Sequence, residues 1–148
     1  MATPNQSSVQ KGYMFEDLSV GMTASAERTI TEADIQKFAD VSGDHNPLHL
    51  DAAYAATTMF KERIAHGMLS AGFISALVAH QLPGVGCVYV SQLLKFKAPV
   101  KIGDTVVTRG EITALIPEKK FIVLKTQCLV RDKVVIDGEA TLMVPSRG

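Results

Sequence analysis

The sequence lacks the many cysteines that form disulfide bonds in small domains, and it lacks the excess of basic residues that binds a polyanion. It has no tryptophan and only two cysteines, Cys87 and Cys128, which lie far apart in strand-like apolar runs. We therefore expect two reduced core thiols, not a disulfide framework or a Cys-x-x-Cys site. Fifteen basic residues balance fifteen acidic ones, which leaves no broad basic surface for nucleic acid or an acidic membrane. Any anionic ligand must be met by a few local groups.

Several motifs are absent as well. The chain has no Walker loop and no Gly-x-Gly-x-x-Gly run after a strand, which excludes P-loop NTPases and nucleotide-fold oxidoreductases. Residues 1–12 are polar and lack the charged start and apolar run of a secretory signal. We expect these residues to form a flexible tail, followed by a single domain over residues 13–148. The cytoplasm is the expected location.

What the sequence does contain is an ordered series of helix and strand signals. Residues 22–30 are strand-like, and Thr31 before an acidic turn predicts a helix that ends at Gly43. After a predicted loop at residues 44–49, Asp51 can cap a short helix. Residues 65–82 have helical length and are apolar on nearly every face. Such a segment is a buried helix or a membrane span, and the histidines at both ends favour burial.

The rest of the chain reads as about four strands with no helix between them. The faces expected to be buried are Ile122, Leu124, Thr126, Cys128 and Val130 on one strand, and Ala140, Leu142 and Val144 on another. Helices followed by a run of strands predict the α+β class, with an antiparallel sheet packed on one side by helix.

The segment between the predicted helices carries the clearest candidate chemistry. Asp44 and His49 lie on one proline-stiffened loop, where a carboxylate and an imidazole can exchange protons with a common ligand. On spacing alone, a solvated or capping loop explains them too. His45 and Asp51 would be further ligands for a metal. Pro47 interrupts the helical spacing of the two histidines, however, and no second cluster completes a coordination shell. We therefore expect no metal.

Two further places have a functional and an ordinary interpretation. His66 and Gly67 lie at the start of the apolar helix, where free N–H groups can receive an oxygen that gains negative charge. The ordinary interpretation is a turn glycine and a capping histidine. Ser75 is one of few hydroxyls on that helix, and most such serines bond to the carbonyl four residues back.

Residues 44–49, Asp-His-Asn-Pro-Leu-His, resemble the Asp-x-Asn-Pro-hydrophobic-His hydratase motif of the MaoC-like family. The similarity continues in order through residues 49–55, 64–69 and 96–100 and the Gly-Asp pair at 103–104, and covers nearly the whole chain from about Phe15. It is closest to short bacterial (R)-specific enoyl-CoA hydratases that feed polyhydroxyalkanoate synthesis. The resemblance implies a hot dog fold, with an antiparallel sheet wrapped around one long buried helix at residues 67–81, a hydratase overhang at residues 44–62, and a homodimer.

The same resemblance implies roles for individual residues. Asp44 is the general base on water, His49 delivers a proton to C2, and the Gly67 N–H receives the thioester oxygen. Ser75 helps to hold the site. The reaction is the reversible hydration of a trans-2-enoyl-CoA to the (R)-3-hydroxyacyl-CoA. No cofactor is implied, because CoA is part of the substrate.

Substrate contacts are expected from the overhang and from the buried helix. The candidate substrate-binding residues are Asn46, Tyr54, Met59, His66, Leu77 and Val78, and the candidate donors to CoA phosphates are Arg63, Lys95, Lys97 and Lys101. Three rival functions remain at this point. They are a 3-hydroxyacyl-ACP dehydratase, a hot dog acyl-CoA thioesterase, and an acyl-CoA-binding scaffold without activity.

Overall fold

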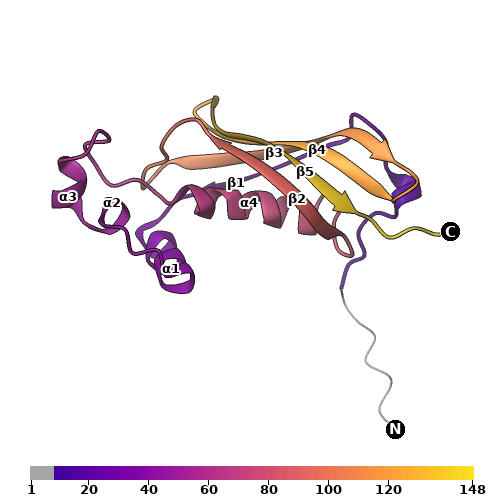
Figure 1. The fold of residues 1–148 in the computed structure, drawn as a ribbon, viewed down its shortest axis with the longest axis horizontal. Helices are drawn as coiled ribbons and strands as arrows, with labels where there is room; N and C mark the ends of the chain where they lie inside the picture. The colour runs from indigo at the N-terminus through magenta and orange to yellow at the C-terminus, as the bar shows by residue number, and fades with distance from the viewer. Residues whose placement is uncertain (1–8) are drawn as a thin grey trace, which may run out of the picture.

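A computed structural model describes residues 9–148, in which one curved sheet covers one side of a long helix (Figure 1). The helices are the 3-10 turn η1 (Phe15–Asp17), α1 (Glu32–Ser42), α2 (Pro47–Leu50), α3 (Ala52–Ala56) and α4 (Gly67–His80). The strands are β1 (Thr23–Thr29), β2 (Val88–Phe96), β3 (Thr105–Ile116), β4 (Phe121–Val130) and β5 (Lys133–Met143). The predicted α+β order, with four strands after the long helix, is confirmed.

The sheet is antiparallel throughout, in the order β1-β3-β4-β5-β2. Alternation along β4 and β5 places the two predicted faces inside, and every residue of both faces is buried. The tight turn between these strands uses Arg131 and Asp132, both at positive φ. β2 is an edge strand that pairs with β5 alone within the described chain. The interior of the sheet is therefore well covered, while its two edge strands, β1 and β2, each pair on one side only within the described chain.

Helix α4 differs from the prediction in how completely it is buried. Its sheet side is enclosed, with Ile74, Leu77 and Val78 in the core. Its other side is open, and Gly72 and Ser75 are exposed. The reason is that the five strands of this chain cover α4 from one side only (Figure 1). None of the helices in residues 9–148 is long and apolar enough to cross a membrane.

Helices α1, α2 and α3 gather at the N-terminal end of α4, away from the C-terminus (Figure 1). Thr31 caps α1 through a reciprocal bond pair with Asp34, and Asp51 accepts the Tyr54 N–H at the start of α3, as predicted. The prediction of a loop over residues 44–49 is wrong from Pro47 onward, because α2 begins there. Proline is well tolerated at the first helical position, where its missing N–H would have no partner.

The N-terminal segment meets the main body where the long helix ends. The Gly12 N–H donates to the Val85 carbonyl oxygen, at 3.1 Å, and the Tyr13 N–H donates to the Pro83 carbonyl oxygen, at 2.8 Å. Residues 1–8 of the predicted tail lie outside the described residues. Gly12 itself is packed so closely on Gly84 and Val85 that an added Cβ would lie 2.6 Å from their backbone.

Candidate active site

Asp44 is placed by the end of α1. Gly43, at φ 79°, ends the helix in the left-handed conformation that glycine adopts without strain. The Asp44 N–H then donates to Ser42 Oγ, and the Asp44 carboxylate accepts the Asn46 N–H. The side chain of Asp44 is exposed. A charged carboxylate is thus held near solvent on a turn whose backbone is tied at both sides.

His49 lies on α2 and is almost buried, with 8% of its surface exposed. Its Nδ1 lies 2.8 Å from the Ile64 carbonyl oxygen. A carbonyl oxygen only accepts, so Nδ1 carries the hydrogen and Nε2 is left to exchange protons. The carbonyl of His49 itself accepts a 2.7 Å bond from Arg63 Nε, and Arg63 also pairs with Glu32 on α1. Both the ring and the backbone of His49 are therefore fixed.

His66, the residue before α4, joins these two groups. Its Nε2 lies 3.0 Å from the Asp44 carbonyl oxygen, and its ring stacks on His49 with centroids 3.9 Å apart. One side-chain oxygen or nitrogen from each of Asp44, His49 and His66 lies within 4.8 Å of the others. Burial lowers the pKa of His66, so a neutral ring is favoured. The three residues form one polar cluster at the start of α4.

The same three residues are the only group with metal-ligand potential in residues 9–148. Of the four ligands weighed from the sequence, Asp44 and His49 lie in this group, whereas His45 pairs with Asp40 and Asp51 caps α3. One nitrogen of each ring is already engaged with a carbonyl oxygen, Nδ1 in His49 and Nε2 in His66. The absence of a metal stays a prediction.

A cavity of about 550 Å³ opens beside the cluster. It is lined by Met59 and Phe60 of the overhang, by Gly67, Met68 and Ser70 of α4, and by residues 96–100, from the last residue of β2 onward. Ile64 and Ala65 form part of its wall, and Ile64 also supplies the carbonyl that holds His49. The cavity and the cluster thus meet along the segment that leads into α4.

Gly67 presents its backbone at this junction. No acceptor among residues 9–148 takes the Gly67 N–H, whereas the Leu69 N–H already donates to the His66 carbonyl oxygen. An added Cβ at Gly67 would lie 2.6 Å from the ring of Phe96. Glycine is needed here because an aromatic ring occupies the space of a side chain. The sequence suggested close approach of a ligand, but could not show that Phe96 is the neighbour.

The other predicted site residues are spread more widely. Ser75 lies eight residues beyond Gly67, which is about 12 Å along a helix, on the open side of α4. Val78 is enclosed in the core, and Leu77 lines a separate cavity of about 270 Å³ beside β1. Neither residue is among those that line the cavity beside Gly67. Their roles in substrate binding stay predictions that this arrangement does not support.

The overhang residues are placed in different ways. Met59 lines the cavity and is 83% exposed, whereas Tyr54 is half exposed on α3. Asn46 accepts the Leu48 N–H and caps α2, a local structural task. Ser70 was not predicted, although its Oγ is buried without a hydrogen-bond partner in the described chain and the residue lines the cavity. Its only sequence signal was a hydroxyl on an apolar helix, which Ser75 shares.

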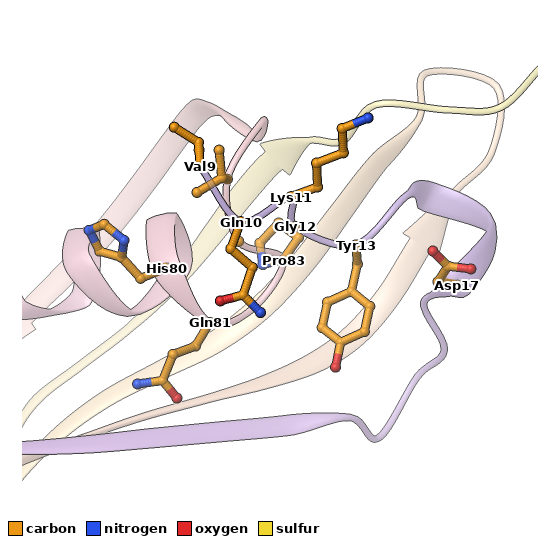
Figure 2. Close-up of a pocket in the computed structure, with 11 residues that line it drawn as sticks. Val9, Gln10, Lys11, Gly12, Tyr13, Asp17, His80, Gln81 and Pro83 are labelled. Carbon is orange, nitrogen blue, oxygen red and sulfur yellow. The ribbon is translucent and has the colours of Figure 1, made fainter. Parts of the chain in front are cut away.

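A second cavity, of about 640 Å³, lies at the opposite end of α4 (Figure 2). It is formed by the chain before η1 and by the end of α4 with the loop that follows, and includes Lys11, Tyr13, His80 and Gln81. No cluster like Asp44, His49 and His66 occurs there among the described residues. Size alone therefore does not identify the reactive cavity.

The family model for the MaoC-like domain matches residues 18–134. The chain belongs to the MaoC-like family. Over 136 residues, this MaoC-like domain is 59% identical to a Rhodospirillum rubrum protein named (R)-specific enoyl-CoA hydratase, covering 92% of the chain and 94% of the relative. The resemblance seen in residues 44–104 is thereby confirmed.

Solved structures agree with this assignment. The MaoC-like domain superposes with a TM-score of 0.86 on the R-hydratase PhaJ1 of Pseudomonas aeruginosa, at 48% identity, covering 92% of the chain and 88% of that structure. It superposes with a TM-score of 0.85 on an (R)-hydratase of A. caviae involved in PHA biosynthesis, at 42% identity, covering 88% and 99%. The predicted hot dog fold is confirmed.

Proposed function

We propose that this protein is an (R)-specific enoyl-CoA hydratase, which adds water reversibly to trans-2-enoyl-CoA. The observation that carries the proposal is the cluster of Asp44, His49 and His66 beside the free N–H of Gly67. Hydration needs a group that takes a proton from water, a group that gives one to C2, and a donor for the thioester oxygen. The cluster and the start of α4 supply these three groups side by side.

The chemical step follows from this placement. The Asp44 carboxylate takes a proton from water while the oxygen bonds to C3. The π electrons of the double bond move toward the thioester, whose oxygen gains charge and accepts the Gly67 N–H. The Nε2–H of a protonated His49 then forms the new C2–H bond. A proton passed from Asp44 back to His49 restores the starting state, and dehydration runs the same steps in reverse.

Stereochemistry follows from having both groups on one element pair. Asp44 and His49 reach the substrate from the same side, since a carboxylate oxygen of Asp44 and a ring nitrogen of His49 lie within 4.8 Å of one another. Water oxygen and proton are then added to one face of the double bond, which is a syn addition. The (R) product follows when the substrate presents the face that gives the (R) configuration at C3, and the chirality of the product tests this. The cavity of about 550 Å³ beside Gly67 is the place we assign to substrate.

Lys97 is the basic residue best placed for the phosphates of CoA. It lines the rim of the cavity and makes no ion pair within the described chain. Arg63, another candidate from the sequence, is engaged with Glu32 and with the His49 carbonyl, and Lys101 pairs with Glu62. A cytoplasmic location and the need for no cofactor stay predictions.

We also propose a homodimer, formed over the β2 edge. Val88, Val90, Leu93 and Phe96 on this strand are about half exposed. A long apolar edge strand is a template for pairing with another chain, and the open side of α4 offers a second surface to cover. Replacing Leu93 with lysine is expected to give a monomer by sedimentation velocity. The control is Val41→Lys, an equally drastic change at an exposed position on α1, which should leave the mass unchanged.

One assay tests the reaction itself. Crotonyl-CoA is incubated with the protein, and loss of enoyl absorbance, free thiol and the chirality of the product are followed together. The expected result is (R)-3-hydroxybutyryl-CoA without free CoA. Release of CoA would instead identify a thioesterase, and no reaction with any enoyl chain length would leave a binding scaffold. Activity with an acyl-carrier-protein thioester but not with the CoA thioester would point to a dehydratase of that carrier.

A further inference from the structure

Burial of the polar His66 side chain at this position is unfavourable for the stability of the fold. His66 is 2% exposed at the start of an apolar helix, and its Nδ1 is buried without a partner in the described chain. Buried polar atoms are nearly always hydrogen-bonded, because an unpaired one has lost its bonds to water without replacement and destabilises the folded state. A hydrophobic side chain at this site would avoid that cost. The retained imidazole therefore needs an explanation in its other contacts.

Those contacts reach both of the proposed catalytic residues. The Asp44 carbonyl oxygen accepts a hydrogen bond from His66 Nε2, at 3.0 Å. The face of the His66 ring lies 3.9 Å from that of His49, and its other neighbour is the ring of Phe38, at 4.8 Å. A single side chain thus binds the backbone of one catalytic residue and stacks on the ring of the other.

Within their own segment the two residues are connected through the backbone of Asn46, whose N–H donates to the Asp44 carboxylate and whose carbonyl oxygen accepts the His49 N–H. The His49 ring is held separately, by the Ile64 carbonyl oxygen. Among these contacts, only His66 touches both the ring of His49 and the backbone of Asp44, so it ties the placement of carboxylate and imidazole to the start of α4. In a proton-transfer site a misplacement of about 1 Å can cost a factor of 10² in rate.

We propose that His66 is a positioning residue, a neutral imidazole in its Nε2–H form that locks the Asp44 backbone against the His49 ring. This role rests on the hydratase function proposed above. The charged and titratable groups around the ring are Asp44, His45 and His49. A cation at His66 would oppose the protonation of His49 on which the chemical step depends. Burial keeps the ring neutral, which suits this purpose.

Three variants separate the two contacts. His66→Gln can place an amide N–H where Nε2 lies, so it keeps the bond to Asp44 and loses the stacking. His66→Phe keeps a stacked ring and loses the bond. His66→Asn is too short for either contact. We expect kcat to fall by about 10²-fold in the Asn variant and less in the other two, with KM for crotonyl-CoA changed less than about threefold.

The kcat of each variant is compared with that of the wild type, and only for variants that are shown to be folded. Urea unfolding identifies any variant that loses activity because it is unfolded, and the Gln and Phe variants keep the test open if the Asn variant does not fold. If the His66→Asn variant folds and has the same kcat as an active wild type, the positioning role is overturned. An inactive wild type would instead overturn the proposed function.

A measurement without substrate addresses the same proposal. Nitrogen-15 NMR of the four histidines reports which ring nitrogen carries hydrogen and when each ring titrates. We expect His66 to be neutral at pH 7 with hydrogen on Nε2, and we expect the ring signals of His49 to shift in the Asn variant, which loses the stacked neighbour. His80, at the far end of α4, provides the internal control. A His66 that is charged at pH 7, or protonated on Nδ1, would contradict the proposal.

Discussion

The two ends of α4 carry cavities of similar size but different chemistry. The N-terminal end holds a cavity of about 550 Å³ beside the polar cluster of Asp44, His49 and His66, and within the described residues the C-terminal end holds one of about 640 Å³ without such a cluster. Phe15, Val78 and Leu82 pack together in the hydrophobic core near the C-terminal end. The candidate active site is thus identified by a few polar groups at one end of α4 and not by the volume of the cavity.

Replacing either proposed catalytic residue should have the largest effect, because it removes the reactive group that distinguishes the N-terminal end of α4 from the C-terminal end. Asp44→Asn and His49→Gln keep side-chain size and remove the proton acceptor and the proton donor. Because general acid–base groups contribute about 10²- to 10⁴-fold in rate, each variant should lose turnover by that amount. Asp44 is exposed, so Asp44→Asn should also keep the unfolding midpoint. Steady-state hydration of crotonyl-CoA measures the loss, and near-normal turnover in either variant would remove that residue from the mechanism.

A smaller loss is expected where the backbone meets substrate. Gly67→Ala keeps the N–H but introduces a Cβ 2.6 Å from the Phe96 ring. The ring or the start of α4 must move, so we expect turnover to fall about tenfold, less than the 10²–10³ for a lost oxyanion donor. The ring of Phe96 is half exposed and can be trimmed without opening the core.

The double variant Gly67→Ala, Phe96→Leu identifies the cause of that loss. If the clash is responsible, the double variant should recover most of the turnover of Phe96→Leu alone, and the two changes will be strongly non-additive. Additive losses would mean that Gly67 is required for reasons other than Phe96, such as room for the thioester itself.

Much of this molecule was predictable from local sequence, and the failures share one cause. The caps at Thr31 and Asp51, the buried faces of β4 and β5, and the pairing of Asp44 with His49 depend on neighbouring residues or on a recognisable motif. The link from His66 to Asp44, the ring of Phe96 over Gly67 and the open side of α4 depend on elements far apart in the chain. Periodicity cannot show which distant element covers a given face.

The helix at Pro47 failed for a different reason. Proline interrupts the interior of a helix but is favourable at its first position. The sequence signal for such a start is Asn46, a capping residue directly before Pro47. The difference matters for the site, because α2 carries His49, whose ring bonds to the Ile64 carbonyl oxygen.

Burial of His66 at the N-terminal end of α4 should also make the free energy of unfolding depend on pH. The pKa of His66 is lowered in the folded state by burial, so between that pKa and about 6.5 the unfolded chain binds more protons. The stability contribution is complete above about pH 6.5 and is lost as the pH falls through that window. Each pKa unit of difference corresponds to about 1.4 kcal/mol.

Urea unfolding at about pH 7 and pH 5.5 measures this effect before carboxylates contribute. The lowered pKa values of Glu32, Asp34 and Asp104 act only below their ordinary values of 4.5 and 3.8. The wild type should therefore lose more unfolding free energy over this interval than His66→Gln. An equal loss in both proteins would assign the pH dependence to the other histidines.

The smallest effect is expected at the opposite end of α4. His80 and Lys11 line the larger cavity there (Figure 2), and neither is part of the cluster at Asp44. His80→Asn and Lys11→Ala should therefore keep turnover within about a factor of two, since neither group meets the reacting atoms. A tenfold loss in either variant would mean that the second cavity takes part in the reaction. In that case the contrast between the two helix ends, on which the assignment of the active site rests, would fail.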